Sequence, residues 1–175
     1  MNYASEYRKF IEGDDGCLEC IVEAYYRGLV LYLTRFTGNY ADAEDILQET
    51  ITYLAIKKPR FKGDSGFKTW LYKIATNKAK NYLRKHKVTI TELNEEIIAP
   101  EEYEAESSYI DSYEKKQLYK CIKELPEDYR QVIYLAYFEE MRADEIAKTM
   151  GKNKKAIENL LYRAKSKLKE RLDNI

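Results

Sequence analysis

The chain has little glycine, proline or cysteine and no long apolar run, and each shortage excludes a kind of protein. Seven Gly and three Pro among 175 residues are too few for many hairpins or long irregular loops, which favours helices. Three Cys, an odd number, do not form a disulfide framework and fit a reducing compartment. No apolar run approaches the ~18 residues of a membrane span, and the start, MNYASEYRKF, lacks the apolar core of a signal peptide. We therefore expect an all-α, cytoplasmic protein.

The sequence also lacks the residue groupings typical of an enzyme. It contains one His, no glycine-rich phosphate loop and no nucleophile with an evident base. Cys17 and Cys20 have the C-x-x-C spacing of half a zinc site, but the other ligands would have to be Cys121 and His86. We favour the alternative that Cys17 and Cys20 are small buried side chains beside a helix start. We expect no enzymatic activity, no cofactor and no small-molecule substrate.

A net charge of zero conceals a distribution in which acidic and basic blocks alternate along the chain. Residues 1–56 contain ten acids and four bases, and residues 89–114 contain nine acids and no Lys or Arg. By contrast, residues 57–88 contain 11 bases and one acid, and residues 151–172 contain eight bases and two acids. Such blocks can be solvated faces or tails, but basic blocks on amphipathic, aromatic-bearing helices are typical of phosphate binding. The pattern predicts a DNA-binding protein with two separate basic segments.

Apolar residues recur at helical spacing over 18–36, 43–54 and 67–83, which predicts a compact helical bundle. We expect Gly38 and Asn39 to end the first helix and Asp42 to cap the second, which stops before Pro59. After the third expected helix, the stretch over 88–112 is acidic, contains Pro100 and has no clean helical period. We interpret it as a linker. The predicted organisation is a first domain over 1–88, a linker over 89–112 and a second domain over 113–175.

The second domain has the helix order of a helix-turn-helix unit. We expect helices over 113–122, 127–139, 143–150 and 154–172, with a turn at Gly151, Lys152 and Asn153. In the last helix Ile157, Leu161, Ala164 and Leu168 repeat at helical spacing and should face the core. The opposite face is either a charged solvent surface or a surface that contacts phosphates and base edges. It carries Lys154, Lys155, Glu158, Asn159, Tyr162, Arg163 and Ser166.

The basic block around Trp70 interleaves cations with aromatic rings, a combination suited to unpaired bases. Rings stack on a base that has left the duplex, at about 1–3 kcal/mol each, while nearby cations hold the backbone. Phe67 and Trp70 also lie on the apolar stripe, so core packing is at least an equal interpretation of each. Phe61 lies off that stripe, in an expected loop, and is the better candidate for base contact.

The helix expected over 43–54 has a polar face with two carboxylates, formed by Asp45, Gln48, Glu49 and Thr52. This face should not meet DNA, because its charge has the same sign as the phosphates. It is either plain surface or a docking site for a basic protein partner.

Three segments together resemble a known protein family. DAEDILQET (42–50) and FKGDSGFKTWLYKIATNKAKNYLRK (61–85) resemble conserved region 2 of bacterial RNA polymerase sigma factors of the extracytoplasmic-function type. LPEDYRQVIYLAYFEEMRADEIAKTMGKNKKAIENLLYRAKSKLKERL (125–172) resembles their region 4. The resemblance implies a sigma factor that binds the beta-prime and beta subunits of core polymerase, directs it to promoters and helps to open the DNA. It also implies an anti-sigma partner, often membrane-bound.

The resemblance further implies a role for each matching position. Asp45, Gln48 and Glu49 match the helix that docks on beta-prime, and Thr52 shares their face. The segment 154–165 matches the helix that reads the minus-35 element. The residues that match the base-capturing loop and the helices that melt and read the minus-10 element are Phe61, Lys62, Asp64, Ser65, Phe67, Trp70, Asn77, Lys78, Asn81, Tyr82, Arg84 and Lys85.

Two residues depart from the family pattern, and one other function remains open. Glu158 and Leu160 stand where the family usually has basic residues, so the minus-35 sequence cannot be taken from relatives. Glu158 could accept a hydrogen bond from a cytosine amine, whereas Leu160 could belong to the core. The other function is a stand-alone helix-turn-helix regulator, which would explain the second domain but neither DAEDILQET nor the basic block around Trp70.

Overall fold

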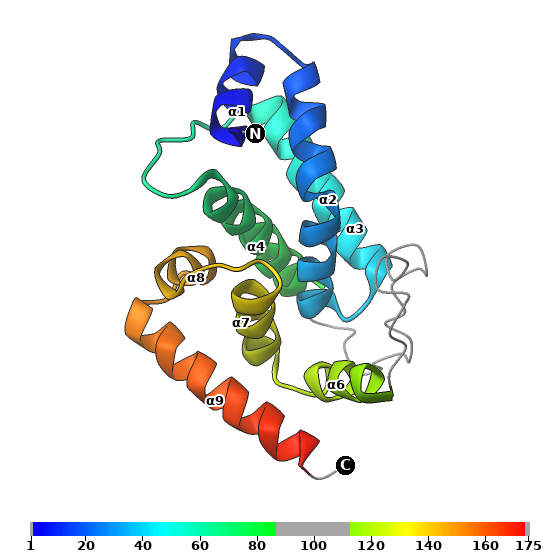
Figure 1. The fold of residues 1–175 in the computed structure, drawn as a ribbon. Coiled ribbons are helices and arrows are strands. Elements are labelled where there is room, and N and C mark those ends of the chain that lie inside the picture. Colours follow the sequence, from blue (N-terminus) through cyan, green and yellow to red (C-terminus); the bar gives the residue numbers. More distant parts are fainter. Residues whose placement is uncertain (1, 87–112, 174–175) are drawn as a thin grey trace. The chain divides into compact units, whose positions relative to one another are not determined.

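The computed structural model describes residues 2–86 and 113–173, which form helices and, within these ranges, no strand (Figure 1). The expected all-α class is therefore confirmed. The chain divides into two compact units, Met1–Ile97 and Ile98–Ile175. The linker expected over 89–112 lies outside the described residues. No helix in the described ranges is long and apolar enough to cross a membrane.

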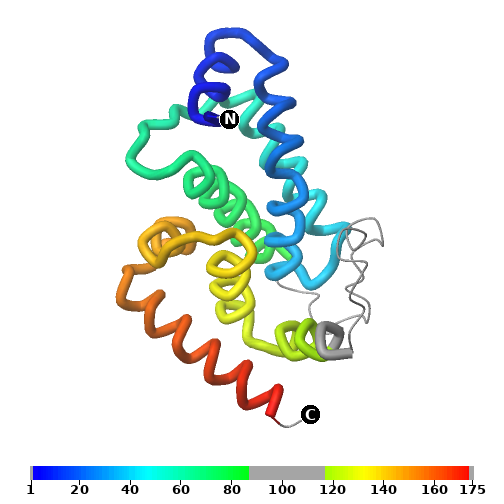
Figure 2. The backbone as a smooth tube through the Cα atoms, in the orientation of Figure 1, coloured from blue at the N-terminus to red at the C-terminus, as the bar shows by residue number. Residues whose placement is uncertain are grey.

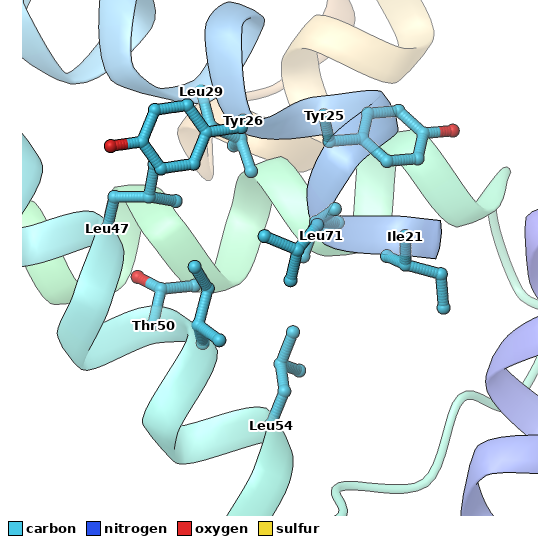
Figure 3. A pocket seen from close by; sticks show the side chains of 10 residues that line it. Ile21, Tyr25, Tyr26, Leu29, Leu47, Thr50, Leu54 and Leu71 are labelled. Atoms are coloured by element: carbon cyan, nitrogen blue, oxygen red, sulfur yellow. The ribbon is translucent and has the colours of Figure 1, made fainter. Parts of the chain in front are cut away.

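The first unit consists of α1 (Tyr3–Glu12), α2 (Gly16–Thr37), α3 (Tyr40–Lys57) and α4 (Phe67–Lys85). Helix α2 packs against the other three, and α3 also packs against α4 (Figures 1 and 2). The apolar stripes of α2, α3 and α4 converge on a small hollow of about 10 Å³, enough for about one water. Its lining includes Ile21, Leu29, Leu47, Leu54 and Leu71 (Figure 3). The three helices predicted from periodicity are thus present and closely packed.

The corner between α2 and α3 differs from the prediction in one residue. Gly38 ends α2 with φ at 76°, a left-handed conformation that glycine adopts without penalty. Asn39, rather than Asp42, caps α3, because its side-chain oxygen accepts the backbone N–H of Asp42 at 2.8 Å. The prediction of Asp42 as the cap is therefore wrong. The resulting two-residue connection makes α2 and α3 an antiparallel pair (Figure 1).

The second unit consists of α6 (Tyr113–Lys123), α7 (Glu127–Tyr137), α8 (Ala143–Met150) and α9 (Lys154–Leu172). Gly151 ends α8 with φ at 70°, and the Asn153 side chain caps α9 by accepting the Ala156 N–H at 2.8 Å. Helix α9 packs on α6, α7 and α8, and its Ile157 and Ala164 are fully buried. The predicted helix-turn-helix is confirmed.

Two details of the second unit differ from the prediction. Helix α7 ends at Tyr137, two residues earlier than expected, and Glu140 beyond it has a left-handed φ of 52°. Leu161 and Leu168, which were expected to face the core, are half-buried.

Candidate nucleic-acid and protein interfaces

The polar face predicted on α3 is a solvent-exposed surface. Its four residues, Asp45, Gln48, Glu49 and Thr52, are all exposed, while Ile46 and Leu47 between them are buried. We call these four residues the acidic face of α3. Helical geometry separates it from the apolar stripe, so a partner can reach the carboxylates without disturbing the core.

The α4 residues expected to bind the minus-10 element lie on two different faces of the helix. The Lys78 ammonium lies 2.7 Å from Glu49 and 4.8 Å from the centroid of the Tyr53 ring, so it points toward α3. Tyr82 also faces α3. Burial and, as the smaller cause, a hydrogen bond with Asp42 raise the pKa of its hydroxyl. Its ring stacks on His86 at 4.2 Å.

The other face of α4 is open to solvent. It carries Asn77, Asn81, Arg84 and Lys85. Arg84 donates a hydrogen bond to the Asn81 side-chain oxygen at 3.2 Å, which holds the Asn81 amide beside the guanidinium. This face combines amides that can read base edges with cations that can hold phosphates.

The loop between α3 and α4, residues 58–66, encloses a pocket of about 240 Å³, and we call it the pocket loop. The Phe61 ring packs against the Trp70 ring, with centroids 5.4 Å apart, and both side chains are half-buried. Phe67 is only 7% exposed and packs behind them. The lining residues are Arg60, Phe61, Lys62, Gly63, Asp64, Ser65 and Trp70. The structure therefore brings Phe61 and Trp70 together at a pocket and places Phe67 in the core.

The face of α9 opposite its buried side is exposed to solvent. All seven residues expected to meet the minus-35 element are exposed, and Tyr162 is the most exposed large hydrophobic residue in the described chain, at 74%. Glu158 lies 3.9 Å from Lys154, a loose pair one turn apart. Leu160 is half-buried and therefore contributes partly to packing.

Several residues near these surfaces were not indicated by the sequence patterns. Tyr53 lies under Lys78. Helix α1 was not predicted, yet the hydroxyl of its Tyr7 donates to the backbone oxygen of Pro59 at 2.8 Å. Tyr3, Tyr7 and Phe10 follow Asn2 at helical spacing and could have revealed this helix.

The cysteines do not form a metal site in the described structure. Within 2–86 and 113–173, no group of three or more His, Cys, Asp or Glu side chains could hold a metal ion. Cys17 is buried as expected, and burial together with hydrogen bonds to Glu6 and Asp14 raises the pKa of its thiol to about 12. Cys20 is exposed, so the prediction that it is buried is wrong. Cys17 and Ile21, one turn apart, lie on the buried side of α2, and Cys20 lies beside that side.

Two protein-family models match the chain: Sigma-70 region 2 over residues 21–89, and Sigma-70 region 4 over residues 115–168. The RNA polymerase sigma factor SigV of Bacillus subtilis is 33% identical over 129 residues, which are 74% of this chain and 75% of SigV. The ECF RNA polymerase sigma-E factor of Haemophilus influenzae is 28% identical over 173 residues, 92% of this chain and 90% of that protein. The fold matches that of the sigma factor RpoE in complex with the anti-sigma factor NepR from Bartonella quintana. The TM-score is 0.71 at 21% identity, over 89% of this chain and 96% of that chain.

Proposed function

The chain belongs to the extracytoplasmic-function family of RNA polymerase sigma factors, and on that premise we propose how its two units divide the start of transcription. A sigma factor binds core RNA polymerase, directs it to specific promoters and promotes opening of the DNA. We propose that the first unit docks on polymerase and opens the minus-10 element, and that the second reads the minus-35 duplex. The protein itself makes and breaks no covalent bond and acts in the cytoplasm. A stand-alone regulator is not favoured, because the region 2 match would then have no role.

The pocket beside Trp70 is the observation that carries the minus-10 assignment. Phe61 and Trp70 offer aromatic surfaces on which a flipped base can stack, and Arg60 and Lys62 supply charge for the adjacent phosphates. Asp64 and Ser65 add polar groups that can meet the edge of that base. A pocket of this composition suits a single unpaired base better than duplex DNA.

The two faces of the α3–α4 pair suit two different partners. The acidic face of α3 repels DNA and attracts a basic protein surface, which supports docking on the beta-prime subunit. The solvent face of α4, with Asn77, Asn81, Arg84 and Lys85, suits the separated strands next to the captured base. Lys78 and Tyr82 lie between these two faces, where they hold α4 against α3.

Helix α9 supplies the duplex-reading surface of the second unit. Its N-terminal turns carry Lys154, Lys155, Glu158 and Asn159, and the first turns of a recognition helix are those that meet base edges. Because this face is exposed while Ile157 and Ala164 are buried, the helix can enter a major groove without unpacking from α8.

The remaining proposals concern organisation and partners. The domains are residues 1–88 and 113–175, and residues 89–112 link them so that they reach promoter elements that are set apart. Polymerase contacts include the beta subunit as well as beta-prime. An anti-sigma factor holds the protein inactive; the complex of RpoE with the anti-sigma factor NepR, a match of the same fold, supports a partner of this kind.

Run-off transcription tests the function directly. Core polymerase alone, and core polymerase with the full chain, would be supplied with a pool of genomic DNA fragments and the transcript ends mapped. We expect the chain to direct starts at defined sites downstream of a shared pair of sequence elements. Starts that are no more defined than those of core polymerase alone would contradict the proposal.

A further inference from the structure

We propose that Tyr7 of α1 is a positioning residue for the pocket loop, so that a helix outside the region 2 match controls base capture. The match begins at residue 21, whereas α1 spans Tyr3–Glu12. The inference rests on the proposed function of the pocket. The Tyr7 hydroxyl donates a hydrogen bond to the Pro59 carbonyl oxygen, which is 2.8 Å away and 52 residues further along the sequence.

The Pro59 carbonyl is the point at which the loop backbone can be held. Proline has no backbone N–H, so this oxygen is the only backbone group through which Pro59 can form a hydrogen bond. Tyr7 is 1% exposed, which keeps competing water away from its hydroxyl. The bond therefore sets where the loop leaves α3, immediately before the pocket residue Arg60.

A second contact holds the neighbouring residue of the loop to the same helix. The Lys58 backbone, which ends α3, is left-handed, with φ at 43°, a conformation uncommon for residues other than glycine. The Lys58 ammonium lies 4.5 Å from the centroid of the Phe10 ring and 3.4 Å from the Phe10 carbonyl oxygen. Two successive loop residues, 58 and 59, are thus attached to two α1 residues one turn apart.

The Tyr7 ring also supports the rings at the pocket. Its centroid lies 5.0 Å from that of Trp70 and 5.6 Å from that of Phe67. Trp70 in turn lies 5.4 Å from Phe61, so the ring contacts run from α1 to the pocket. A small shift of α1 would therefore move both the start of the loop and the surface on which a base would stack.

Tyr7→Phe tests the hydrogen bond alone, because it keeps the ring and removes only the hydroxyl. Tyr32→Phe is the matched control: Tyr32 is also fully buried, and its hydroxyl lies 3.0 Å from the Thr76 hydroxyl, between α2 and α4. Each variant removes the hydroxyl of a buried tyrosine and its hydrogen bond, but only Tyr7→Phe releases the pocket loop. Phe10→Leu removes the ring beneath Lys58. If Tyr7→Phe does not fold, this variant tests whether α1 holds the pocket loop.

Holoenzyme would be reconstituted with each full-length variant on a promoter found by run-off transcription. The measurements are polymerase affinity, the rate of opening by permanganate reactivity of unpaired thymines, and the rate of run-off transcription on a template already mismatched at the minus-10 element. We expect Tyr7→Phe to open the duplex about three- to tenfold more slowly than Tyr32→Phe, the fold-change that one net hydrogen bond represents. Polymerase affinity should be equal for the two, and the mismatched template should reduce the difference.

If wild type is active and Tyr7→Phe and Tyr32→Phe open the promoter at equal rates, the proposed role of Tyr7 is overturned while the proposed function stands. A defect of Tyr7→Phe that is the same on duplex and mismatched templates and is matched by lost polymerase affinity would also overturn that role. If wild type directs no defined start, the proposed function fails, and the role of Tyr7 fails with it.

Discussion

The Lys78 ammonium lies 2.7 Å from the Glu49 carboxylate, so a residue expected to bind DNA is paired with one expected to bind polymerase. The Lys78 side chain is 22% exposed and that of Glu49 is 54% exposed. The lysine is therefore held between α3 and α4, while the carboxylate remains accessible to a partner. The pair joins the acidic face of α3 to the helix that we propose binds the minus-10 element.

Glu49→Gln should weaken binding to core polymerase while leaving the fold nearly unchanged. The substitution removes a carboxylate from the acidic face, and a half-exposed ion pair contributes only about 0–1 kcal/mol to stability. Competition against a labelled sigma factor would measure affinity, and urea unfolding would measure stability. Lys78→Gln breaks the same pair but keeps the carboxylate, so it should bind polymerase normally. Equal weakening by both variants would place the effect in the ion pair rather than in the acidic face.

Trp70→Ala should impair promoter opening more than polymerase binding. It removes a stacking surface for the captured base, which is worth about 1–3 kcal/mol. Permanganate reactivity of the minus-10 thymines would measure opening, and the competition assay would measure polymerase binding. Equal losses in both would show that Trp70 acts mainly in the core, through its contacts with Tyr7 and Phe67.

Replacing Lys154 and Lys155 together by Gln should make duplex binding less sensitive to salt. Each phosphate contact that is lost removes about 0.9 from the slope of log affinity against log salt concentration. Titrations of a minus-35 duplex at several salt concentrations would measure the slope. Lys167→Gln, near the other end of α9 and paired with Glu170, is the control and should change it little. An unchanged slope for the double variant would contradict phosphate contact at the start of α9.

Glu158→Ala should relax the choice of base at one position of the minus-35 element. A carboxylate in the major groove can accept a hydrogen bond from the cytosine amine, and a good base contact discriminates by about 1–3 kcal/mol. The loose 3.9 Å pairing with Lys154 leaves the carboxylate available. Selection of bound sites from a randomised duplex pool would report the preference, with Glu170→Ala as control. Identical preferences for wild type and Glu158→Ala would exclude base reading by this residue.

The three cysteines should differ sharply in reactivity. Cys20 is exposed, whereas Cys17 and Cys121 are buried. Because the pKa of Cys17 is raised to about 12, its reactive thiolate remains scarce in the folded protein until the pH approaches that value. Mass spectrometry after brief iodoacetamide treatment at pH 7 and pH 9 should show one adduct on the folded protein and three in urea. Rapid labelling of Cys17 at pH 9 in the folded protein would contradict its burial.

The sequence predicted those features that depend on local periodicity. The 3.6-residue spacing of Ile157 and Ala164 located the buried side of α9, and the residues opposite them are exposed. The same argument separated the acidic face of α3 from Ile46 and Leu47. These predictions succeeded because the pattern repeats within a single helix and depends on no distant contact.

Features that depend on distant contacts were not predicted. The role of α1 comes from Tyr7 meeting Pro59 and Trp70, and no local pattern records contacts over more than 50 residues. The pocket likewise exists only because the loop returns Phe61 to Trp70. At the start of α3, Asn39 and Asp42 are both good capping residues. The left-handed turn at Gly38 lets α3 start at Tyr40, with Asn39 as its cap.

Trp70 is the only tryptophan in the chain, and it lines the pocket. Excitation at wavelengths that tyrosine does not absorb will therefore report on this one place, and the second unit will contribute no emission of that kind. A nucleotide that stacks on the indole should quench the signal without any attached dye. The unmodified protein thus carries its own optical probe of single-strand binding.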